Sequence, residues 1–292
     1  MGHSFAHVID ATDLNPRLRR IRLEVPDLDS LGLHGAPDDA VGIYFPAADQ
    51  SSPPPMEHRD GVWGYHDPAT APDARSYSIR TVDHHARTID VDFVVHARGP
   101  ATSWAQRARP GDGVMLAHPR GWYRPPPAID WCLLAADLAG LPALARILED
   151  RTESAAAIAV VEVFDRTDLD YLPHTTGTDV IPIVGSGNGF GPSALATTIR
   201  GLELPPGQGY CWFAGEAAES RAVRKYLRHE HRWGRDHYDI IGYWRADGDE
   251  WSRRYAQHGE ELFAVYQRAI ADGLGEKAAA EAFDEELERR GL

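Results

Sequence analysis

The segment ARSYSIR, residues 74–80, brings two guanidinium groups, a phenol and a hydroxyl together in one short run. Alternate side chains of a strand share a face, which predicts Arg75 and Tyr77 on one face and Ser78 and Arg80 on the other. An arginine beside an aromatic ring and a hydroxyl suits a flat ligand that is polar at one edge and carries phosphate. A half-buried strand tyrosine between solvated arginines is the better explanation when these residues are taken alone.

A second candidate lies in VVHARGPATSWA, residues 94–105, which continues from an alternating strand pattern. Gly99 permits close backbone approach to a ligand, and Thr102 is expected to cap a helix that begins nearby. The unpaired N–H groups at such a helix start favour a pyrophosphate. A flavin nucleotide meets the requirements of both segments.

The composition limits the classes of partner. The chain has 292 residues, of which 43% are hydrophobic and 25% charged, so a folded protein of two domains is expected. Its formal charge of −14, from 30 basic and 44 acidic residues, would repel a phosphate backbone over most of the surface. Nucleic acid is therefore not an expected partner.

Neither a membrane segment nor an export signal is visible. No apolar run is long enough to span a bilayer, and the first residues, MGHSFAHVID, lack a charged segment followed by an apolar one. Cys132 and Cys211 stand in apolar strand-like runs without metal-ligand spacing, as expected for core residues in a reduced compartment. These features predict a cytoplasmic protein without membrane insertion.

The first 125 or so residues alternate as strands do. Apolar residues alternate with charged ones in IRLEV at 21–25 and IDVDFVV at 89–95. VGIYF, YSIR and VMLAH add short strands between clusters of Pro, Gly and Asp. This pattern predicts an antiparallel barrel or sandwich, with a long surface loop at 47–74 that leads into the ARSYSIR segment.

After RPPP at 124–127 the pattern changes to short apolar runs that alternate with helix-like segments. The runs are WCLLAA, AIAVVEVF, DVIPIV, YCWFAG and YDIIGYW, and GLPALARILEDR, GPSALATTIRGL and EAAESRAVRKYLRHEHRW are helix-like. Buried strands interleaved with helices predict a mostly parallel sheet covered on both faces. From residue 251 onward, apolar residues at helical spacing predict a two-helix appendage that must dock against another part of the chain.

Other patterns carry less weight. The stretch GSGNGFG at 185–191 follows a predicted strand, but Phe190 stands where G-x-G-x-x-G requires its third glycine, and no P-loop lysine follows. A loop is expected there, with direct nucleotide contact the lesser alternative. The 14 histidines form no metal-ligand pattern, and the sequence has no Ser-His-Asp or Cys-His signature of a nucleophile. We therefore predict no metal bound by the protein's own side chains.

The sequence resembles the siderophore-interacting protein family, which comprises cytoplasmic FAD-containing ferric-siderophore reductases of the ferredoxin reductase-like superfamily. The resemblance extends from about Val8 to Gly248 and is carried, in this order, by RSYSIR, DFVVHARGPATSWA, GDGVMLAHPRGWY, LLAADLAGLPALARILE, WFAGEAAESRAVRKYLR and IIGYWRADG. It implies an N-terminal antiparallel six-stranded flavin-binding β-barrel at 1–126. A doubly wound parallel-sheet domain of the NAD(P)H-binding type at 127–250 and a C-terminal helical appendage at 251–292 would follow.

By this resemblance, FAD lies along the ARSYSIR strand. Tyr77 is expected to stack on the isoalloxazine ring, Ser78 to hydrogen-bond near its N5 atom, and Arg75 to neutralise the phosphates. Tyr77 and Ser78 are therefore the expected catalytic residues of an electron transfer that needs no nucleophile or general base. The FAD site is completed by Ile79, Arg80, His96, Gly99, Pro100, Ala101 and Thr102, while Trp104 is expected to hold the helix in place.

The resemblance also implies a donor side at the carboxyl ends of the parallel strands. NADH or NADPH would bind there, with Asp137, Gly215, Glu216 and Arg221 as candidate residues and Arg221 assigned to a nucleotide phosphate. An exposed helix position explains Arg221 equally well. The family pattern Asp-Glu-Thr-Ala-Leu-Pro-Ala is replaced by DLAGLPA at 137–143, which lacks a carboxylate and a hydroxyl and makes a ferredoxin an alternative electron donor.

A ferric siderophore is the substrate that the resemblance implies. Catecholate chelates are anionic, so basic residues are expected near the flavin. Arg245 is the first candidate, and Arg120 and Arg124 are less favoured candidates. A solvated arginine is the alternative for each of the three. Two other functions stay open, a general flavin or ferredoxin reductase with another acceptor and a siderophore-binding flavoprotein without turnover. A monomer or weak dimer is expected, with a ferredoxin as a candidate protein partner.

Overall fold

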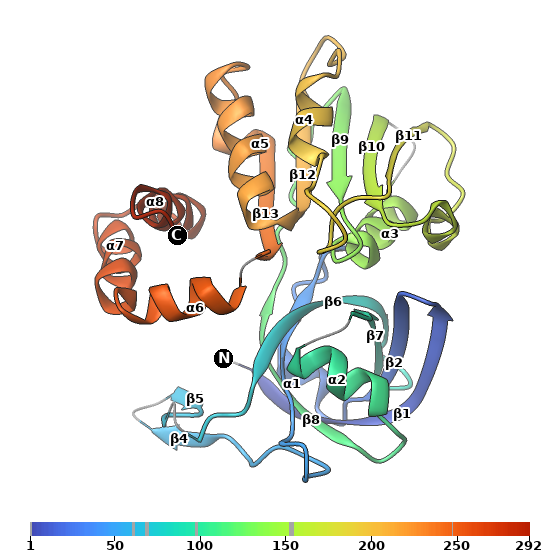
Figure 1. Ribbon diagram of the computed structural model, residues 1–292, viewed down its shortest axis with the longest axis vertical. Coiled ribbons are helices and arrows are strands. Elements are labelled where there is room, and N and C mark those ends of the chain that lie inside the picture. The colour runs from blue at the N-terminus through green and yellow to red at the C-terminus, as the bar shows by residue number, and fades with distance from the viewer. Residues whose placement is uncertain (1, 60–61, 68–69, 97–98, 152–154, 247) are drawn as a thin grey trace.

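The molecule consists of a closed barrel, a five-stranded sheet with helices on both faces, and three C-terminal helices beside that sheet (Figure 1). In this view the barrel lies below the sheet and the C-terminal helices lie to the left. This architecture confirms the predicted order of a barrel, a parallel sheet and a helical extension. The computed structural model describes residues 2–292 except 60–61, 68–69, 97–98, 152–154 and 247.

The barrel forms because its strands alternate apolar and polar side chains. Its strands are β1 His3–Asn15, β2 Leu18–Glu24, β3 Ala40–Tyr44, β6 Ala74–Asp83, β7 Thr88–Val94 and β8 Gly113–Arg120. In β2, Ile21 and Leu23 are fully buried while Arg22 between them is exposed. The strands pair antiparallel in the closed order β1-β2-β7-β6-β3-β8, which leaves no free sheet edge.

Two helices belong to the barrel. The single turn α1, Leu28–Leu31, buries both of its leucines in the barrel core. The longer α2, Pro100–Arg107, buries Trp104, whose ring lies 5.2 Å from the Phe45 ring and 5.7 Å from the Phe93 ring. Trp104 therefore anchors α2 to the core, as expected from the sequence.

A short hairpin stands within the segment that was predicted as a surface loop. Strand β4, Glu57–Arg59, pairs with β5, Val62–Gly64. The ring of Trp63 lies 4.7 Å from the ring of His3, so the hairpin rests against the start of β1. The loop prediction for 47–74 is therefore incomplete, because the hairpin packs on a residue distant in the sequence, a contact that the polar local sequence does not indicate.

The second domain is built on a parallel sheet in the order β11-β10-β9-β12-β13. Its strands are β9 Trp131–Ala136, β10 Ala156–Val163, β11 Thr178–Val184, β12 Gly209–Glu216 and β13 Tyr238–Trp244. All six residues of the central strand β9 are buried, because both of its faces are covered. The five apolar runs therefore form the predicted strands.

Helices cover the two faces of this sheet with separate apolar clusters. One cluster joins Leu134 and Trp212 to α3, Leu141–Asp150, and to the 3-10 helix η1, Arg166–Tyr171. The opposite cluster joins the sheet to the remaining helices, α4 Leu195–Arg200 and α5 Ala217–His229, with the 3-10 helix η2 Arg235–His237 before β13. The sheet is thus doubly wound, as predicted.

Three helices follow the sheet, where the sequence predicts two. They are α6 Gly248–Ala256, α7 Gly259–Ala271 and α8 Glu276–Arg289. Leu262 and Leu287 form a small core between α7 and α8, against which Trp251 of α6 packs. Helix α6 was missed because its apolar face is limited to the stacked rings of Trp251 and Tyr255, which is too short to give a helical stripe.

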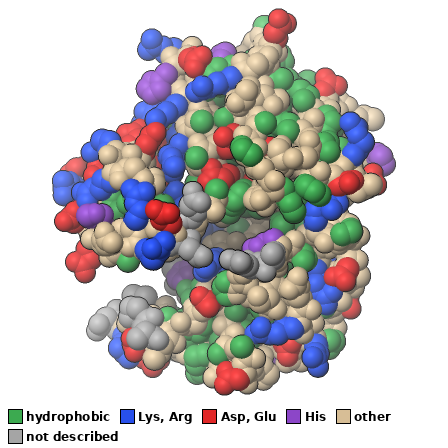
Figure 2. All heavy atoms as spheres, in the orientation of Figure 1, with side chains coloured by type: hydrophobic (Ala, Val, Ile, Leu, Met, Phe, Trp, Pro, Cys, Tyr) green, Lys and Arg blue, Asp and Glu red, His purple; other side chains and the backbone are tan. Residues whose placement is uncertain are grey.

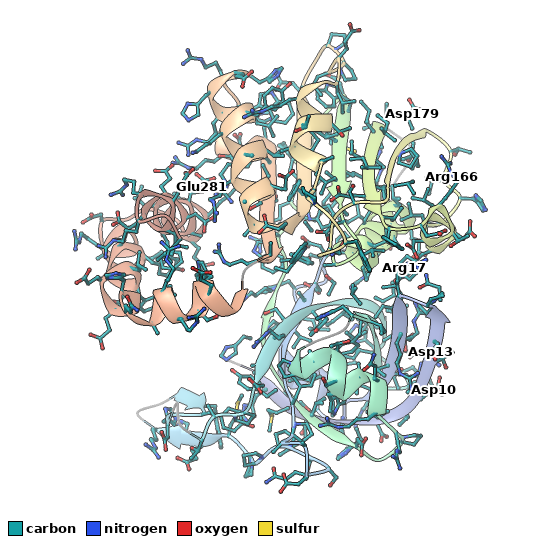
Figure 3. The ribbon with its side chains drawn as sticks, viewed as in Figure 1. Asp10, Asp13, Arg17, Arg166, Asp179 and Glu281 are labelled. Carbon is teal, nitrogen blue, oxygen red and sulfur yellow. The ribbon has the colours of Figure 1, made fainter. Side chains whose placement is uncertain are left out.

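Opposite charges dock this appendage on the second domain. Arg224 of α5 donates to Asp284 of α8 at 2.9 Å, and Arg235 donates to Glu281 at 2.6 Å. Figure 3 labels Glu281 where α8 faces α5, and Figure 2 shows Lys and Arg side chains beside Asp and Glu side chains over this region. The appendage thus has the docking partner that its sequence requires.

Buried carboxylates join the barrel to the second domain. Arg17, between β1 and β2, donates from Nε to both carboxylate oxygens of Asp168 in η1, at 2.8 and 2.7 Å. Figure 3 shows Arg17 at the top of the barrel, below the second domain. Asp92 of β7 accepts from Arg20 in the barrel and from the Tyr171 hydroxyl of η1. The charge of Asp168 is therefore compensated by Arg17 only when the two domains are in contact, while Asp92, already paired with Arg20, gains a further donor there.

Arg17→Ala is expected to lower the free energy of unfolding by about 3 kcal/mol, because Asp168 would stay buried without its cation. Urea unfolding followed by tryptophan fluorescence measures the loss. Arg59→Ala is the matched control, since Arg59 and Glu57 form an exposed pair worth less than about 1 kcal/mol. Equal losses in the two variants would contradict the role of the Arg17–Asp168 pair.

Candidate functional site

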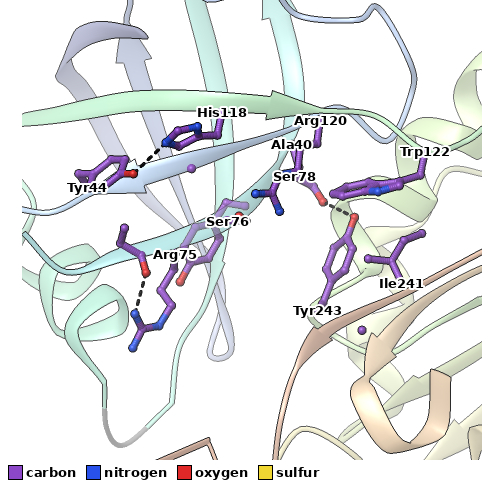
Figure 4. A pocket seen from close by; sticks show the side chains of 14 residues that line it. Ala40, Tyr44, Arg75, Ser76, Ser78, His118, Arg120, Trp122, Ile241 and Tyr243 are labelled. Carbon is purple, nitrogen blue, oxygen red and sulfur yellow. Dashed lines mark hydrogen bonds between the residues drawn. The ribbon is translucent and has the colours of Figure 1, made fainter. Parts of the chain in front are cut away.

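A pocket of about 390 Å³ lies between the barrel and the end of β13 (Figure 4). This volume is within the range of small-molecule sites, roughly 300–1,000 Å³. Strands β3, β6 and β8 supply one wall and β13 supplies the facing wall. The lining residues are Ala40, Gly42, Tyr44, Ala74, Arg75, Ser76, Tyr77, Ser78, His118, Arg120, Trp122, Ile241, Gly242 and Tyr243.

Small residues keep part of the barrel wall open. Ala40, Gly42 and Ala74 offer no side chain beyond a methyl group, so the strand backbone is accessible from the pocket. A Cβ atom at Gly42 would lie 3.1 Å from the carbonyl oxygen of Ala117, because β3 and β8 approach closely there. A wall of this shape suits a flat ligand.

Two pairs of polar side chains face the pocket. The Ser78 and Tyr243 hydroxyl oxygens lie 3.0 Å apart, and the Tyr44 hydroxyl lies 3.0 Å from Nε2 of His118. Burial lowers the pKa of His118, and the positive charge of Arg120 lowers it further, so the imidazole is neutral at neutral pH. The site therefore offers neutral donors and acceptors beside a fixed positive charge.

An irregularity of β8 directs His118 into the pocket. Ala40 pairs with Arg120 and Gly42 pairs with Ala117, so β8 contains one residue more than β3 between these positions. The φ angle of His118 is 55°, in the left-handed region that few residues other than glycine adopt. Such bulges commonly re-aim a side chain beside a functional site.

Two arginines and a tryptophan complete the lining. Arg75 and Arg120 bring positive charge to the barrel wall, and Trp122 brings an aromatic face. The backbone N–H of Trp122 donates to Asp38 at 2.9 Å, and the indole N–H of Trp212 donates to the same carboxylate at 2.9 Å. Burial raises the pKa of Asp38, while these donors oppose the rise. Asp38 thus places Trp122 relative to the sheet of the second domain.

Four residues that the sequence predicts for the site line this pocket, namely Arg75, Tyr77, Ser78 and Arg120. The ring of Tyr77 also packs on the barrel core, with its centroid 4.3 Å from that of Phe93. Burial raises the pKa of Tyr77, so the phenol stays protonated. Stacking of Tyr77 on a flavin ring stays a prediction.

Ile79 and Arg80 lie outside the pocket lining. Ile79 is fully buried in the barrel core. The guanidinium of Arg80 forms two hydrogen bonds with Glu149 of α3, at 2.7 and 2.5 Å, and lies 5.8 Å from the ring centroid of Tyr171. An extra residue in β6 relative to β7, at Arg80, turns this side chain toward the second domain. The structure therefore places Arg80 in the domain junction.

The segment predicted to bind pyrophosphate begins α2 and does not line the pocket. Gly99 precedes the helix with φ of 127°, a conformation that favours glycine, and Pro100 stands in the first turn. Ala101 and Thr102 are buried, and Thr102 Oγ1 bonds the backbone nitrogen and oxygen of His96 at 3.2 and 3.3 Å. Thr102 therefore fixes the strand-to-helix connection and does not cap α2. Phosphate binding by this segment stays a prediction.

Three of the four candidate donor residues, Asp137, Gly215 and Glu216, lie at the carboxyl ends of β9 and β12, while Arg221 stands in α5. Asp137 is buried and accepts hydrogen bonds from the Trp244 indole at 2.6 Å and from the backbone of Ala139 at 2.8 Å. A Cβ atom at Gly215 would lie 3.1 Å from the Asp137 carboxylate, so glycine is needed for this approach. Burial raises the pKa of Asp137 to about 6. The Asp137 carboxylate is thus enclosed by the protein and orients Trp244 through the hydrogen bond from its indole.

Two further groups reach the same edge. Glu216 caps α5 by accepting from the backbone of Ala218 and Glu219, and it also accepts from Ala246 at 3.3 Å. The glycine-rich stretch at 185–191 is a loop, as predicted, and its Asn188 amide oxygen accepts from the backbone of Leu138 at 2.9 Å. Glu216 and the loop therefore organise this edge through backbone contacts.

The other predicted arginines lie outside the pocket. The guanidinium of Arg245 lies 4.3 Å from the ring centroid of Trp251 in α6, and that of Arg124 donates to a backbone carbonyl of its own turn. Arg221 lines a second pocket of about 340 Å³ between α5 and α8. Burial lowers the pKa of Arg245, and the positive charge of Arg221 lowers it further. A substrate role for Arg245 and a donor role for Arg221 stay predictions.

Sequence reasoning missed Tyr44, Ser76, His118, Trp122 and Tyr243 as pocket residues. Four of them stand in motifs that carry the family resemblance, RSYSIR, GDGVMLAHPRGWY and IIGYWRADG, so a signal was present. Tyr44 had no such signal, because it stands outside these motifs and reaches the pocket through the pairing of β3 with β6 and β8.

The described residues also bear on metal binding and membrane insertion. Across the described ranges of the chain, no group of His, Cys, Asp and Glu side chains is placed to hold a metal ion. Of the helices formed by the described residues, none is both long and apolar enough to cross a bilayer. Cys132 and Cys211 are buried and unpaired, as expected for core residues.

Known proteins share both halves of this chain. The family model described as the siderophore-interacting FAD-binding domain matches residues 7–123, and the one described as siderophore-interacting protein matches residues 129–247. The ferric vibriobactin reductase of Vibrio cholerae is 32% identical over 238 residues, which cover 77% of this chain and 85% of that protein. The chain belongs to the siderophore-interacting protein family. The resemblance carried by the six motifs is therefore confirmed.

Further members and neighbours of the family agree with this assignment. The NADPH-dependent ferric-chelate reductase of Escherichia coli is 28% identical over 82% of this chain and 91% of its own length. The crystal structure of a siderophore utilization protein from T. fusca is 27% identical, with a TM-score of 0.74 over 84% of this chain and 93% of that one. A ferredoxin reductase of carbazole 1,9a-dioxygenase, 15% identical with a TM-score of 0.60, shares the fold alone.

Asp137→Asn is expected to change how stability depends on pH. The folded-state pKa of about 6 lies above the value of about 3.9 of an unfolded aspartate, so the wild-type protein loses stability as pH rises from about 4 to about 7. The variant has no carboxyl group to titrate at this position. The difference between its free energy of unfolding and that of the wild type should therefore change by about 3 kcal/mol in favour of the variant as pH rises over that range. Urea unfolding at a series of pH values measures the difference, and a pH-independent difference would contradict the assignment.

Proposed function

We propose that this protein is a flavin-dependent ferric-siderophore reductase, which passes electrons from NAD(P)H or a ferredoxin through FAD to Fe(III) and releases Fe(II). The observation that supports it is the pocket between a barrel of the FAD-binding type and the carboxyl end of a nucleotide-domain strand. Relatives named ferric vibriobactin reductase and NADPH-dependent ferric-chelate reductase favour an iron chelate as the acceptor.

The residues of the pocket fit FAD. The accessible backbone at Ala40 and Gly42 suits a flat ring, the Ser78 hydroxyl suits its polar edge, and Arg75 suits a phosphate. When bound, FAD supplies the ability to take up a hydride and to release electrons one at a time. The protein holds the ring, limits water around it and presents it to the two reaction partners.

Reduction of the metal explains how one electron releases the cargo. Fe(III) is a hard ion that oxygen ligands bind tightly, and a single electron converts it to Fe(II), which the same ligands bind less tightly. No covalent bond to the protein forms, so the site needs no nucleophile. Arg120, which lines the pocket, supplies positive charge for an anionic chelate.

The route of the electrons is tested by anaerobic absorbance titration of the purified protein. NADH, NADPH and reduced ferredoxin are added separately, and a ferric chelate is added afterwards. Bleaching of the flavin by one donor and its return on adding the chelate would support the proposal. A flavin that no donor reduces would favour a siderophore-binding protein without turnover. Flavin absorbance that returns only on addition of quinone or ferredoxin would favour a general reductase.

Arg75→Ala is expected to raise the FAD dissociation constant about tenfold or more, because a charged hydrogen-bond donor to phosphate is lost. Flavin fluorescence on addition to apoprotein measures it. Arg253→Ala, on the exposed surface of α6, is the control and should leave the constant unchanged. Tyr77→Ala should also lower FAD occupancy, but it removes the contact with Phe93 as well. Unchanged FAD binding in both site variants would contradict the placement of FAD.

Arg120→Ala is expected to raise the KM for an anionic ferric chelate about fivefold and the KM for a neutral one less than about twofold. Arg245→Ala is the matched comparison, because Arg245 lies over Trp251 and near Arg221 instead of lining the pocket. It should alter the KM for NADPH more than that for the chelate. If only Arg245→Ala affects the anionic chelate, Arg245 is the substrate residue and Arg120 is not.

A further inference from the structure

A bulge at the end of β13 turns Tyr243 toward the barrel. Gly215 of β12 pairs with Gly242, and the next residue of β12, Glu216, pairs with Trp244, so Tyr243 is an extra residue in β13. Its neighbour Trp244 donates instead to Asp137 of the second domain, at 2.6 Å. Tyr243 is therefore directed across the pocket by the backbone and is not a surface residue that happens to reach it.

The Tyr243 hydroxyl meets the barrel at Ser78. Their oxygens lie 3.0 Å apart, and the two residues are separated by 165 positions in the chain. Ser78 is only 5% exposed and Tyr243 is half-buried, and burial raises the pKa of Tyr243, so both hydroxyls are protonated. Figure 4 shows this bond crossing from the barrel wall to the β13 wall.

The Ser78 and Tyr243 hydroxyl groups carry one proton each, and only one of these two protons lies in the hydrogen bond between them. A phenol is the stronger donor and an aliphatic hydroxyl the stronger acceptor, so Tyr243 donates to Ser78. The proton of Ser78 is then left to point at a third group in the pocket. Hydrogen bonds in such a chain polarise and strengthen one another.

We propose that Tyr243 is a positioning residue that orients the Ser78 hydroxyl as a donor to the polar edge of the flavin. This inference rests on the proposed function, because it takes FAD as the third group. It adds that the second domain takes part in binding the cofactor through one side chain. FAD binding and contact between the two domains are thereby coupled.

A double-mutant cycle tests the coupling. The FAD dissociation constants of apoproteins are measured by flavin fluorescence for wild type, Tyr243→Phe, Ser78→Ala and the double variant. Each single change is expected to raise the constant about threefold to tenfold, as one hydrogen bond is lost. The double variant should be within about twofold of Ser78→Ala, because Tyr243 acts only through Ser78.

Tyr171→Phe is the matched control, since the Tyr171 hydroxyl also bonds across the domain junction, to Asp92, away from the pocket. It should lower the melting temperature and leave FAD affinity within about twofold of wild type. The visible absorbance of bound flavin should shift in Tyr243→Phe and not in Tyr171→Phe. Ser78→Thr keeps the hydroxyl and should retain both near-normal affinity and sensitivity to Tyr243→Phe.

The outcomes separate the two proposals. Wild-type protein that binds no FAD would overturn the proposed function and this inference with it. If wild-type protein binds FAD but the effects of the two substitutions on the FAD dissociation constant multiply in the double variant, only the role of Tyr243 is overturned. An effect of Tyr243→Phe on melting temperature alone, as in the control, would likewise make Tyr243 a structural contact.

Discussion

The structure depends on buried carboxylates that accept hydrogen bonds across the boundary between the two domains. Asp38 of the barrel accepts from Trp212 of the sheet, Asp92 accepts from Tyr171, and Asp168 of the second domain accepts from Arg17. A buried charge that loses its donors costs several kcal/mol, on the order of 3 to 5. The relative placement of the two domains is therefore enforced by electrostatics as well as by apolar contact.

The relative placement of the two domains creates the pocket, and bulges in three strands determine which side chains face it. Extra residues in β8, β6 and β13 aim His118 and Tyr243 into the pocket and turn Arg80 away from it toward Glu149. Regular strands would alternate their side chains strictly between two faces. Bulges break this alternation, so residues of both faces can serve one site.

The charge distribution suits a small anionic ligand in an acidic protein. Most of the basic residues of α5 are neutralised by α8, through pairs such as Arg224–Asp284, while Arg75 and Arg120 remain at the pocket. Positive charge is thus retained at the pocket while it is neutralised on α5. The C-terminal helices contribute by covering the basic face of α5 with acidic side chains, which limits its attraction for other anions.

The sequence by itself determined the order of a barrel and a doubly wound sheet, because period-two and buried-strand patterns are local properties of the chain. It also identified Arg75, Tyr77, Ser78 and Arg120, which belong to motifs of the family. Only the tertiary structure decided the place of Arg80, the position of Arg245 over the Trp251 ring and the approach of Tyr243 to Ser78. These placements depend on bulges and on contacts between distant segments of the chain. A shift of one residue in strand register reverses the direction of a side chain without changing the hydrophobic pattern that predicts the strand.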